Sequence, residues 1–442
     1  MLRSSGGISH SSAMNGPRAT RVQLLAPLLL IPAALVCLSG SALLALNPGA
    51  NANANYLSDG LIVIALLVTA SVWQTVWLPR ADPMLLPLVG ALVGVGMTIV
   101  MRVAPVAAGR QVIWLGVGIV VFSIVVANRR PILFLAGYRY TMAALGVALL
   151  AITIVFGIDP NDSGVRIWLG YGGYNFQPSE LIKVALVIFL AGYLTEMGEL
   201  LGGPSAAATA INGRALVAYL APIGAICGLC LLLLLFQRDL GPAVLFYAVT
   251  LTMLYLATAR RRFVLLGLLA FFGGGALVYR FFSVARIRID IWLDPYSDAA
   301  GRGYQLIQGI VAFASGGLLG VGAGLGYPEI LPAAMTDFPL AVIGEEFGFV
   351  ATLAIVGIFA VLTLRGFAIA YRAKTPFSQL LAAGLTSVLA LQALIIMGGN
   401  LRILPLTGIT LPFISYGGSS LVTNWLIVAL LARISSEKVD GA

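Results

Sequence analysis

The 442-residue sequence is poor in the residues that most often carry metal sites, redox chemistry and proton transfer. It contains one histidine, His10, and three cysteines. Because His10 lies in the polar amino-terminal tail, histidine-based acid/base catalysis and histidine-rich metal sites are excluded. Proton transfer must then fall to carboxylates, lysine, tyrosine or water. Cys227 and Cys230 form a CxxC pair inside the apolar run ICGLCLLLLLF, so we interpret them as small buried hydrophobic residues.

Charged residues are scarce, and no nucleotide-binding loop of the GxxxxGK(S/T) type is present, which argues against an ATP-driven pump. Only 10% of the residues are charged, whereas 60% are hydrophobic, and the mean hydropathy is +1.00. This composition predicts an all-α integral membrane protein with many spans.

Twelve apolar runs are long enough to cross a bilayer, and they predict a polytopic helical bundle. The predicted spans are residues 23–46, 61–78, 84–101, 111–127, 140–157, 178–195, 215–236, 242–259, 263–282, 341–364, 378–399 and 417–433. The first run is too long for the core of a signal peptide, which favours an uncleaved anchor. Residues 1–22 are expected to form a disordered cytoplasmic tail, and residues 437–442 a short cytoplasmic tail.

Basic residues are distributed unevenly between the two sides that alternating spans define. With the amino terminus inside, the inner side collects Arg80, Arg129, Arg130, Arg260, Arg261, Arg262, Arg365, Arg372 and Lys374. This bias predicts that both termini lie in the cytoplasm. On the other side, Arg280, Arg286, Arg288 and Arg302 crowd one long loop at about 283–340, which suggests an anionic ligand there.

Three carboxylates of the segment 331–348 are the leading candidates for chemistry, because acids at a membrane surface are costly unless they have a function. Asp337 stands alone before an apolar run, and Glu345 and Glu346 are paired at the start of that run. For the pair we favour stabilisation of a helix start by the macrodipole, with metal or substrate contact as the alternative.

Two polar segments interrupt the spans before the large outer loop. In RIWLGYGGYNFQPSELIK, Glu180 and Lys183 share one helical face and are expected to pair or to share a polar cavity. A structural ion pair and a direct substrate role are equally favoured for them. Arg166 is either a substrate contact or an interfacial anchor. In QRDLG, we expect a tight turn with a local ion pair between Arg238 and Asp239.

Two further segments are expected to line a cavity at the outer face. The large outer loop is too apolar and too rich in glycine for solvent, so we expect it to fold back against the membrane face. Its candidate donors to phosphate and sugar are Arg302, Tyr304, Gln305 and Gln308, with Gly316, Gly317, Gly322 and Gly324 allowing close approach. The broken run PLTGITLPFISYGGSS follows Arg402 and supplies Ser415 and Ser419 as candidate substrate contacts.

Together, FQPSELIK, WLDPYSDAAGRGYQLIQ, the Asp337 and Glu345–Glu346 block and PLTGITLPFISYGGSS resemble the motifs of the SEDS family of bacterial cell-wall polymerases. The resemblance covers roughly residues 84–436, and it leaves residues 23–83 as two helices added to the family's ten-helix core. The closing segment is more similar to RodA-like elongation members than to FtsW-like division members. Met335 stands where a histidine often precedes Thr-Asp-Phe, so the acid must act without histidine.

The resemblance implies a peptidoglycan glycosyltransferase that polymerises lipid II at the outer face of the cytoplasmic (inner) membrane, with Asp337 as the catalytic carboxylate. Asp337 would accept the proton of the acceptor 4-hydroxyl while undecaprenyl diphosphate departs. The candidate cations for that diphosphate, with or without Mg²⁺ or Mn²⁺, are Lys183, Arg166, Arg302 and Arg402. An α-linked donor giving a β-linked chain implies a single inversion.

The resemblance also implies a partner, a class B penicillin-binding protein that cross-links the new strands; nothing indicates a nucleic-acid partner. The strongest alternative is a transporter that flips lipid II, against which stand the clustering of ionisable groups at one surface and the lack of repeat symmetry. A non-catalytic scaffold for another wall enzyme is the third interpretation.

Overall fold

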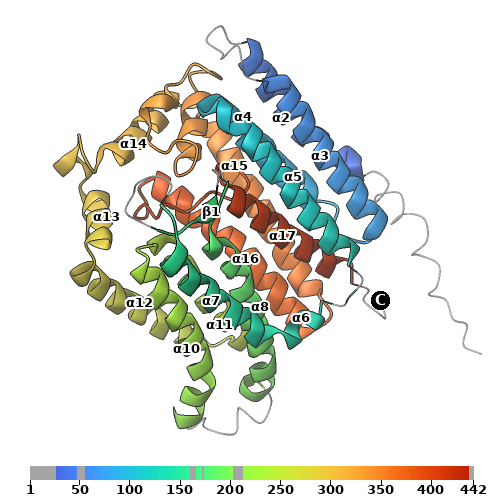
Figure 1. Ribbon diagram of the computed structural model, residues 1–442, viewed down its shortest axis with the longest axis vertical. Coiled ribbons are helices and arrows are strands. Elements are labelled where there is room, and N and C mark those ends of the chain that lie inside the picture. Colours follow the sequence, from blue (N-terminus) through green and yellow to red (C-terminus); the bar gives the residue numbers. More distant parts are fainter. Residues whose placement is uncertain are drawn as a thin grey trace, which may run out of the picture.

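The computed structural model describes residues 26–46, 55–128, 130, 132–159, 166–171, 174–202 and 213–437, and these form a bundle of long helices (Figure 1). The predicted amino-terminal tail lies outside the described residues, as does the carboxyl-terminal tail after residue 437. The elements are η1 (Ala26–Leu30), α2 (Ile31–Leu46), α3 (Tyr56–Trp77), α4 (Leu85–Val103), α5 (Pro105–Ala127), α6 (Phe134–Gly137), α7 (Arg139–Phe156), β1 (Leu169–Tyr171), β2 (Tyr174–Phe176), α8 (Pro178–Gly202), α10 (Gly213–Phe236), α11 (Leu240–Thr258), α12 (Arg261–Phe281), α13 (Ser283–Leu293), η2 (Pro295–Asp298), α14 (Tyr304–Gly316), η3 (Pro328–Ile330), α15 (Pro339–Arg372), α16 (Pro376–Asn400) and α17 (Gly418–Ser435).

Each of the twelve predicted spans corresponds to one of these helices, and the all-α membrane fold is confirmed. Within the described residues, ten helices are long and apolar enough to cross a bilayer, and α8 and α10 complete the twelve. Several helices begin earlier than predicted. Pro105, for example, occupies the first turn of α5, a position where proline lacks only an amide that would have no helical partner.

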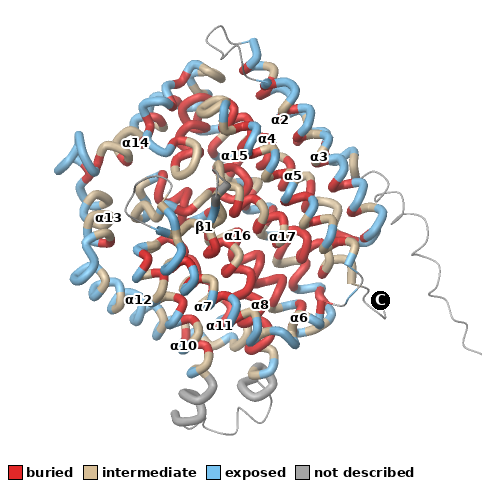
Figure 2. Tube along the Cα trace, in the orientation of Figure 1, coloured by how far each residue is buried: buried red, intermediate tan, exposed pale blue. Residues whose placement is uncertain are grey.

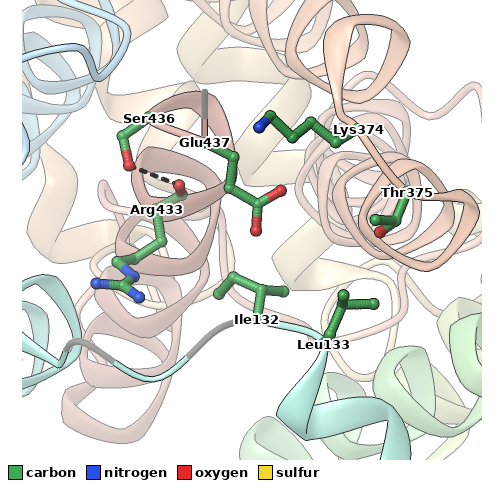
Figure 3. A pocket seen from close by; sticks show the side chains of 7 residues that line it. All are labelled: Ile132, Leu133, Lys374, Thr375, Arg433, Ser436 and Glu437. Atoms are coloured by element: carbon green, nitrogen blue, oxygen red, sulfur yellow. Dashed lines mark hydrogen bonds between the residues drawn. The ribbon is translucent and has the colours of Figure 1, made fainter. Parts of the chain in front are cut away.

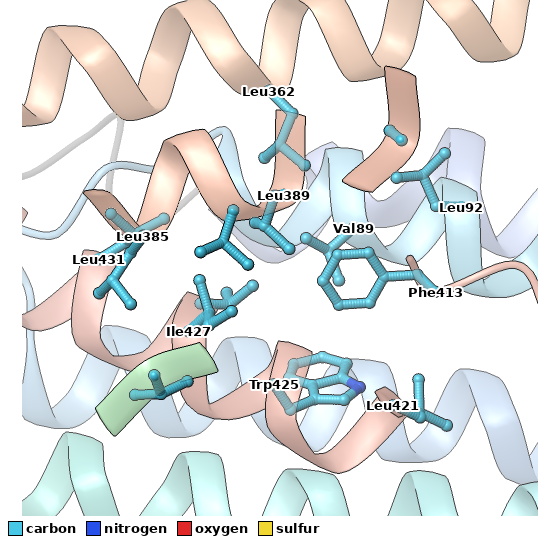
Figure 4. Close-up of a cluster of buried hydrophobic side chains, with 14 of the residues drawn as sticks. Val89, Leu92, Leu362, Leu385, Leu389, Phe413, Leu421, Trp425, Ile427 and Leu431 are labelled. Atoms are coloured by element: carbon cyan, nitrogen blue, oxygen red, sulfur yellow. The ribbon is translucent and has the colours of Figure 1, made fainter. Parts of the chain in front are cut away.

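The centre of the bundle is formed by α17, α16, α8 and α4, which are mostly buried (Figure 2). Trp425 of α17 is fully buried and meets Phe122 of α5 edge to face, with ring centroids 5.5 Å apart. Gly118 lets α5 approach, because a methyl group there would lie 2.8 Å from the Trp425 ring. Trp425 belongs to a cluster of buried side chains from α4, α15, α16 and α17 (Figure 4).

The first two long helices, α2 and α3, lie along α4 and α5 at one side of the bundle (Figure 1). Small residues allow the close approach, since a methyl group at Gly40 would overlap Thr98 of α4. That these helices are an addition to a core at 84–436 stays a prediction.

The long loop between α12 and α15 folds back on the bundle, as expected, and contains the helices α13 and α14 (Figure 1). At the crossing of α14 and α15, Gly316 approaches the carbonyl of Gly344 so closely that a side chain would not fit. The predicted glycine Gly316 therefore serves helix packing. By contrast, α12 is almost entirely unburied and packs mainly on α11 and α13. A short antiparallel hairpin of β1 and β2, which the sequence did not predict, precedes α8.

Candidate active site

Asp337 lies just before α15, on a segment held by hydrogen bonds to its backbone. The carbonyls of residues 335–337 accept, in that order, the backbone N–H of Tyr416 at 2.8 Å, the Ser415 hydroxyl at 2.6 Å and the Asn400 side-chain amide at 2.6 Å. The donors come from the carboxyl end of α16 and the broken segment before α17. The position of Asp337 is thus fixed by main-chain contacts from two distant parts of the chain, and its carboxylate takes no part in them.

Arg288 of α13 and Gly408 lie next to the Asp337 carboxylate. A methyl group at Gly408 would lie 3.5 Å from a guanidinium nitrogen of Arg288 and 3.7 Å from Oδ2 of Asp337. Arg288 is held there by donation to the carbonyl of Leu406 at 3.1 Å. Burial raises the pKa of the Asp337 carboxyl above its ordinary value, and a hydrogen bond with Thr336 and the charge of Arg288 lower it by less. The pair offers a candidate base beside a cation.

Asp239 is a second carboxylate near Arg288. The prediction that it forms a local ion pair with Arg238 is wrong. Arg238 is exposed, with a left-handed backbone (φ 61°), and no ion pair within the described part of the chain joins it to Asp239. Asp239 instead accepts a hydrogen bond from Gln177 Nε2 at 3.2 Å. Burial raises the pKa of Asp239 to about 7, although the hydrogen bond from Gln177 and the charge of Arg288 both lower it.

Glu180 and Lys183 pair as predicted, with Nζ 2.6 Å from Glu180 Oε2. The Lys183 side chain is 2% exposed and also donates to Gln392 Oε1 at 2.9 Å and to Asn424 Oδ1 at 3.1 Å. These contacts use all three ammonium protons and tie α8 to α16 and α17. The arrangement favours the structural ion pair, because Lys183 would have to give up a partner to meet a diphosphate.

Arg402 holds the loop to the bundle in this structure. Its Nε donates to the carbonyl of Trp292 at 3.0 Å and its Nη2 to that of Leu293 at 2.7 Å, while its own carbonyl accepts from the Trp292 indole at 3.1 Å. This reciprocal contact joins the end of α13 to the end of α16. The geometry therefore favours a packing role for Arg402 over diphosphate binding.

The other predicted contacts are spread over two regions. Arg166 is exposed before the hairpin, and Arg302 is exposed in the turn before α14. On α14, Tyr304, Gln305 and Gln308 are half-buried, and Gln305 donates to the carbonyl of Pro332 at 3.1 Å. Ser415 and Ser419 are buried and hold backbone: the Ser415 hydroxyl accepts the N–H of Leu411 at 2.8 Å, and that of Ser419 accepts the N–H of Gln177 at 2.8 Å.

The prediction that Glu345 and Glu346 stabilise a helix start is wrong. Helical geometry in α15 begins at Pro339 and breaks at Gly348 (φ 78°), so the two acids end the first short segment instead of opening a helix. No acidic residue lies in the first turn of α15. The macrodipole at the end of a helical segment does not favour an anion.

Hydrogen bonds and an ion pair stabilise these acids instead. Glu346 pairs with Arg102 of α4 at 2.9 Å and accepts the N–H of Gly324 at 2.9 Å, while Glu345 accepts the N–H of Tyr327 at 3.1 Å. Arg102 also donates to the carbonyl of Gly326 at 2.9 Å. The acids thus fasten the glycine-rich loop to the bundle. Among the described residues, no three His, Cys, Asp or Glu side chains group as a metal site.

Replacing Arg102 by methionine should release this loop. The substitution leaves the Glu346 carboxylate, 2% exposed, without its cation. We expect hydrogen exchange at the amides of Val321, Gly322 and Gly324, which bond to Glu345 and Glu346, to rise on the order of tenfold. Arg286→Met, at an exposed arginine of α13, is the matched control and should leave these amides unchanged. Unaltered exchange in Arg102→Met would show that the loop is held by other contacts.

Sequence reasoning overlooked Arg288 as an individual residue, although it recognised the basic cluster that contains it. Which of four loop arginines faces the carboxylate depends on the orientation of α13. Gln392 and Asn424 were also overlooked. The signal for them was available, because a polar amide within an apolar span marks a buried partner.

The comparisons with known proteins agree on one family. Residues 83–440 match the family model described as FtsW, RodA and SpoVE, cell cycle protein. The chain is 36% identical to "Peptidoglycan glycosyltransferase RodA" of Mycobacterium leprae, covering 92% of this chain and 89% of that protein. It is 35% identical to "Probable peptidoglycan glycosyltransferase FtsW" of Geobacter metallireducens over 68% of this chain and 78% of that protein.

Solved structures give the same result. A structure described as "Structural coordination of polymerization and crosslinking by a peptidoglycan synthase complex" contains a chain that is 28% identical, with a TM-score of 0.67. The match covers 80% of this chain and 97% of that chain. The rod shape determining protein RodA of Thermus thermophilus is 27% identical with a TM-score of 0.58, over 80% of this chain and 96% of that chain.

Proposed function

Since the chain belongs to the FtsW, RodA and SpoVE family, we propose that it is a peptidoglycan glycosyltransferase that polymerises lipid II into glycan strands. The RodA-named relative covers more of the chain than the FtsW-named one, which favours a role in elongation over one in division. The observation that carries the proposal is the Asp337 carboxylate, held through its backbone beside Arg288 at one end of a membrane-spanning bundle.

In this mechanism Asp337 acts as general base on the acceptor sugar hydroxyl. Burial raises the pKa of the carboxyl, which strengthens it as a base, and Arg288 keeps it ionised for the first step. As the hydroxyl oxygen bonds to the anomeric carbon, the bond to the diphosphate breaks and the configuration inverts. Cations near the outer loop stabilise the departing diphosphate. Arg288 is the best placed of them, and Arg166 and Arg302 have exposed guanidinium groups that a substrate could recruit.

The proposal places Asp337 at the outer face of the inner membrane and both termini in the cytoplasm. The support is the bias of arginine and lysine toward the other end of the bundle. We further propose a class B penicillin-binding protein as partner.

Glycan synthesis in detergent distinguishes this enzyme from a lipid II transporter. Detergent micelles have no two compartments between which a lipid could be transported, so a transporter would give no product in this assay. We expect the protein to lengthen glycan from purified lipid II, as seen on a polymer gel. Absence of polymer, with lipid II transport intact after reconstitution in vesicles, would favour the transporter.

The pH dependence of polymerisation should identify the base. The rate is expected to fall as the pH drops through the raised pKa of Asp337, because the base must be ionised. Arg288→Gln removes a charge that lowers the pKa of Asp337. The fall in rate on the acidic side of the pH–rate profile should therefore occur at higher pH in this variant. Because Arg288 also acts on Asp239, the comparison is made in an Asp239→Asn background. If Arg288→Gln leaves the pH–rate profile unchanged in this background, Arg288 does not act on Asp337.

Gly408→Ala should impair activity more than stability. The backbone at Gly408 is left-handed (φ 71°), where alanine costs about 1–2 kcal/mol. The new methyl group would make ordinary contacts with Arg288 and Asp337, so we expect relief of the backbone strain to change the spacing of these two side chains and to slow polymerisation about tenfold. Gly357→Ala on α15, where a methyl group meets nothing within 4 Å, is the control and should be neutral. Full activity of Gly408→Ala would mean that Gly408 does not determine the spacing of Arg288 and Asp337.

A further inference from the structure

A cavity with charged residues in its lining lies at the end of the bundle opposite Asp337. Its volume is about 340 Å³, and its lining includes Ile132, Leu133, Lys374, Thr375, Arg433 and Glu437 (Figure 3). Because α15 runs from the Asp337 end to Arg372, Lys374 stands at its far end, where α16 begins and α17 ends. None of these residues belongs to the site at Asp337.

The lining carries charges of both signs in fixed positions. Figure 3 shows the Glu437 carboxylate between the Lys374 ammonium and the side chains of Ile132 and Leu133. The Arg433 guanidinium is held by the carbonyl of Arg130 at 2.7 Å. Burial raises the pKa of Glu437, and a hydrogen bond with Ser378 and the charges of Lys374 and Arg433 lower it. A carboxylate and two cations therefore share one cavity.

This mixture restricts the ligand. The two cations, Lys374 and Arg433, favour an anionic group, whereas the Glu437 carboxylate offers an acceptor for a hydrogen-bond donor. A phosphate ester that carries a primary ammonium satisfies both, since the phosphate meets the cations while the ammonium donates to the carboxylate. The amino-terminal end of α16, which follows Lys374, adds to the positive potential on the phosphate side.

The surroundings point to a membrane lipid as the source of this group. The cavity lies at the ends of three membrane-spanning helices, α15, α16 and α17, where phospholipid headgroups are found. Leu133 is 48% exposed and offers an apolar surface to the start of an acyl chain. We propose that the cavity binds the ethanolamine phosphate headgroup of a phospholipid, with the phosphate at Lys374 and Arg433 and the ammonium at Glu437.

Native mass spectrometry of the full-length protein in detergent tests the proposal, with dioleoyl phosphatidylethanolamine, phosphatidylglycerol and phosphatidylcholine at equal concentrations. Phosphatidylglycerol lacks the ammonium, and the quaternary ammonium of phosphatidylcholine cannot donate a hydrogen bond. We expect phosphatidylethanolamine to be retained about tenfold better than either. Glu437→Gln should abolish that preference, and Lys374→Met should weaken retention of phosphatidylethanolamine.

Glu196→Gln is the matched control, because this carboxylate lies at the same end of the bundle in an ion pair with Arg139. It should bind like the wild type, as should Asp337→Asn, since lipid binding does not depend on the proposed chemistry. Equal retention of the three lipids, or a preference that survives Glu437→Gln, would overturn the proposal. Displacement of the lipid by equimolar phosphoethanolamine would overturn the lipid source and assign the cavity to a soluble zwitterion.

Discussion

Asp337→Asn is expected to slow glycan polymerisation by about 10²–10⁴-fold, the usual contribution of a positioned general base. The asparagine has the same shape, and the hydrogen bonds at this segment go to backbone carbonyls, so the fold should be retained. The rate is measured with purified lipid II in detergent, and folding is followed by the thermal unfolding midpoint.

The matched control is Asp290→Asn, an exposed carboxylate on α13, the helix that carries Arg288. It should polymerise at the wild-type rate. A wild-type rate in Asp337→Asn would remove Asp337 from its role as base, whereas loss of both activity and folding would leave Asp337 with a structural role only.

Lys183→Met is expected to lower the free energy of unfolding by about 3–5 kcal/mol, because it leaves a buried carboxylate without its cation. The side chains of Glu180, Gln392 and Asn424 would all lose the hydrogen bond that Lys183 donates to them. The stability is measured by denaturant unfolding in micelles. A loss below about 1 kcal/mol would show that the ion pair contributes little to the packing of α8.

The double variant Glu180→Gln with Lys183→Met separates structure from substrate binding. If the pair is structural, the double variant should regain most of the stability that Lys183→Met loses, and it should polymerise at close to the wild-type rate. A double variant that is stable but inactive would indicate that Lys183 binds the diphosphate of the substrate.

The fold was largely predictable because a bilayer demands apolar helices of fixed length, and each predicted run became a helix. Helix ends were less accurate, as at Pro105, because local capping decides them. The hairpin before α8 was missed, since short strands leave little periodic signal. The break at Gly348 was missed as well, and it reversed the interpretation of Glu345 and Glu346.

The sequence named individual candidate residues, but it did not predict how they are arranged in the structure. Asp337 and the Glu180–Lys183 pair could be identified because charges within an apolar sequence are rare. The packing contacts of Arg402 and the position of Arg288 beside Asp337 could not, because they depend on how α13 crosses the end of α16. Asp239 was assigned to its sequence neighbour, whereas its partner, Gln177, is 62 residues away.

A structure of this protein with lipid II and an unreactive acceptor glycan tests the account most directly. The measured quantity is the distance from the Asp337 carboxylate to the acceptor 4-hydroxyl. We expect about 2.6–3.2 Å, with the donor diphosphate on the far side of the anomeric carbon and Arg288 nearby. An acceptor hydroxyl bound beyond reach of Asp337, with another side chain in hydrogen-bonding contact, would contradict the account.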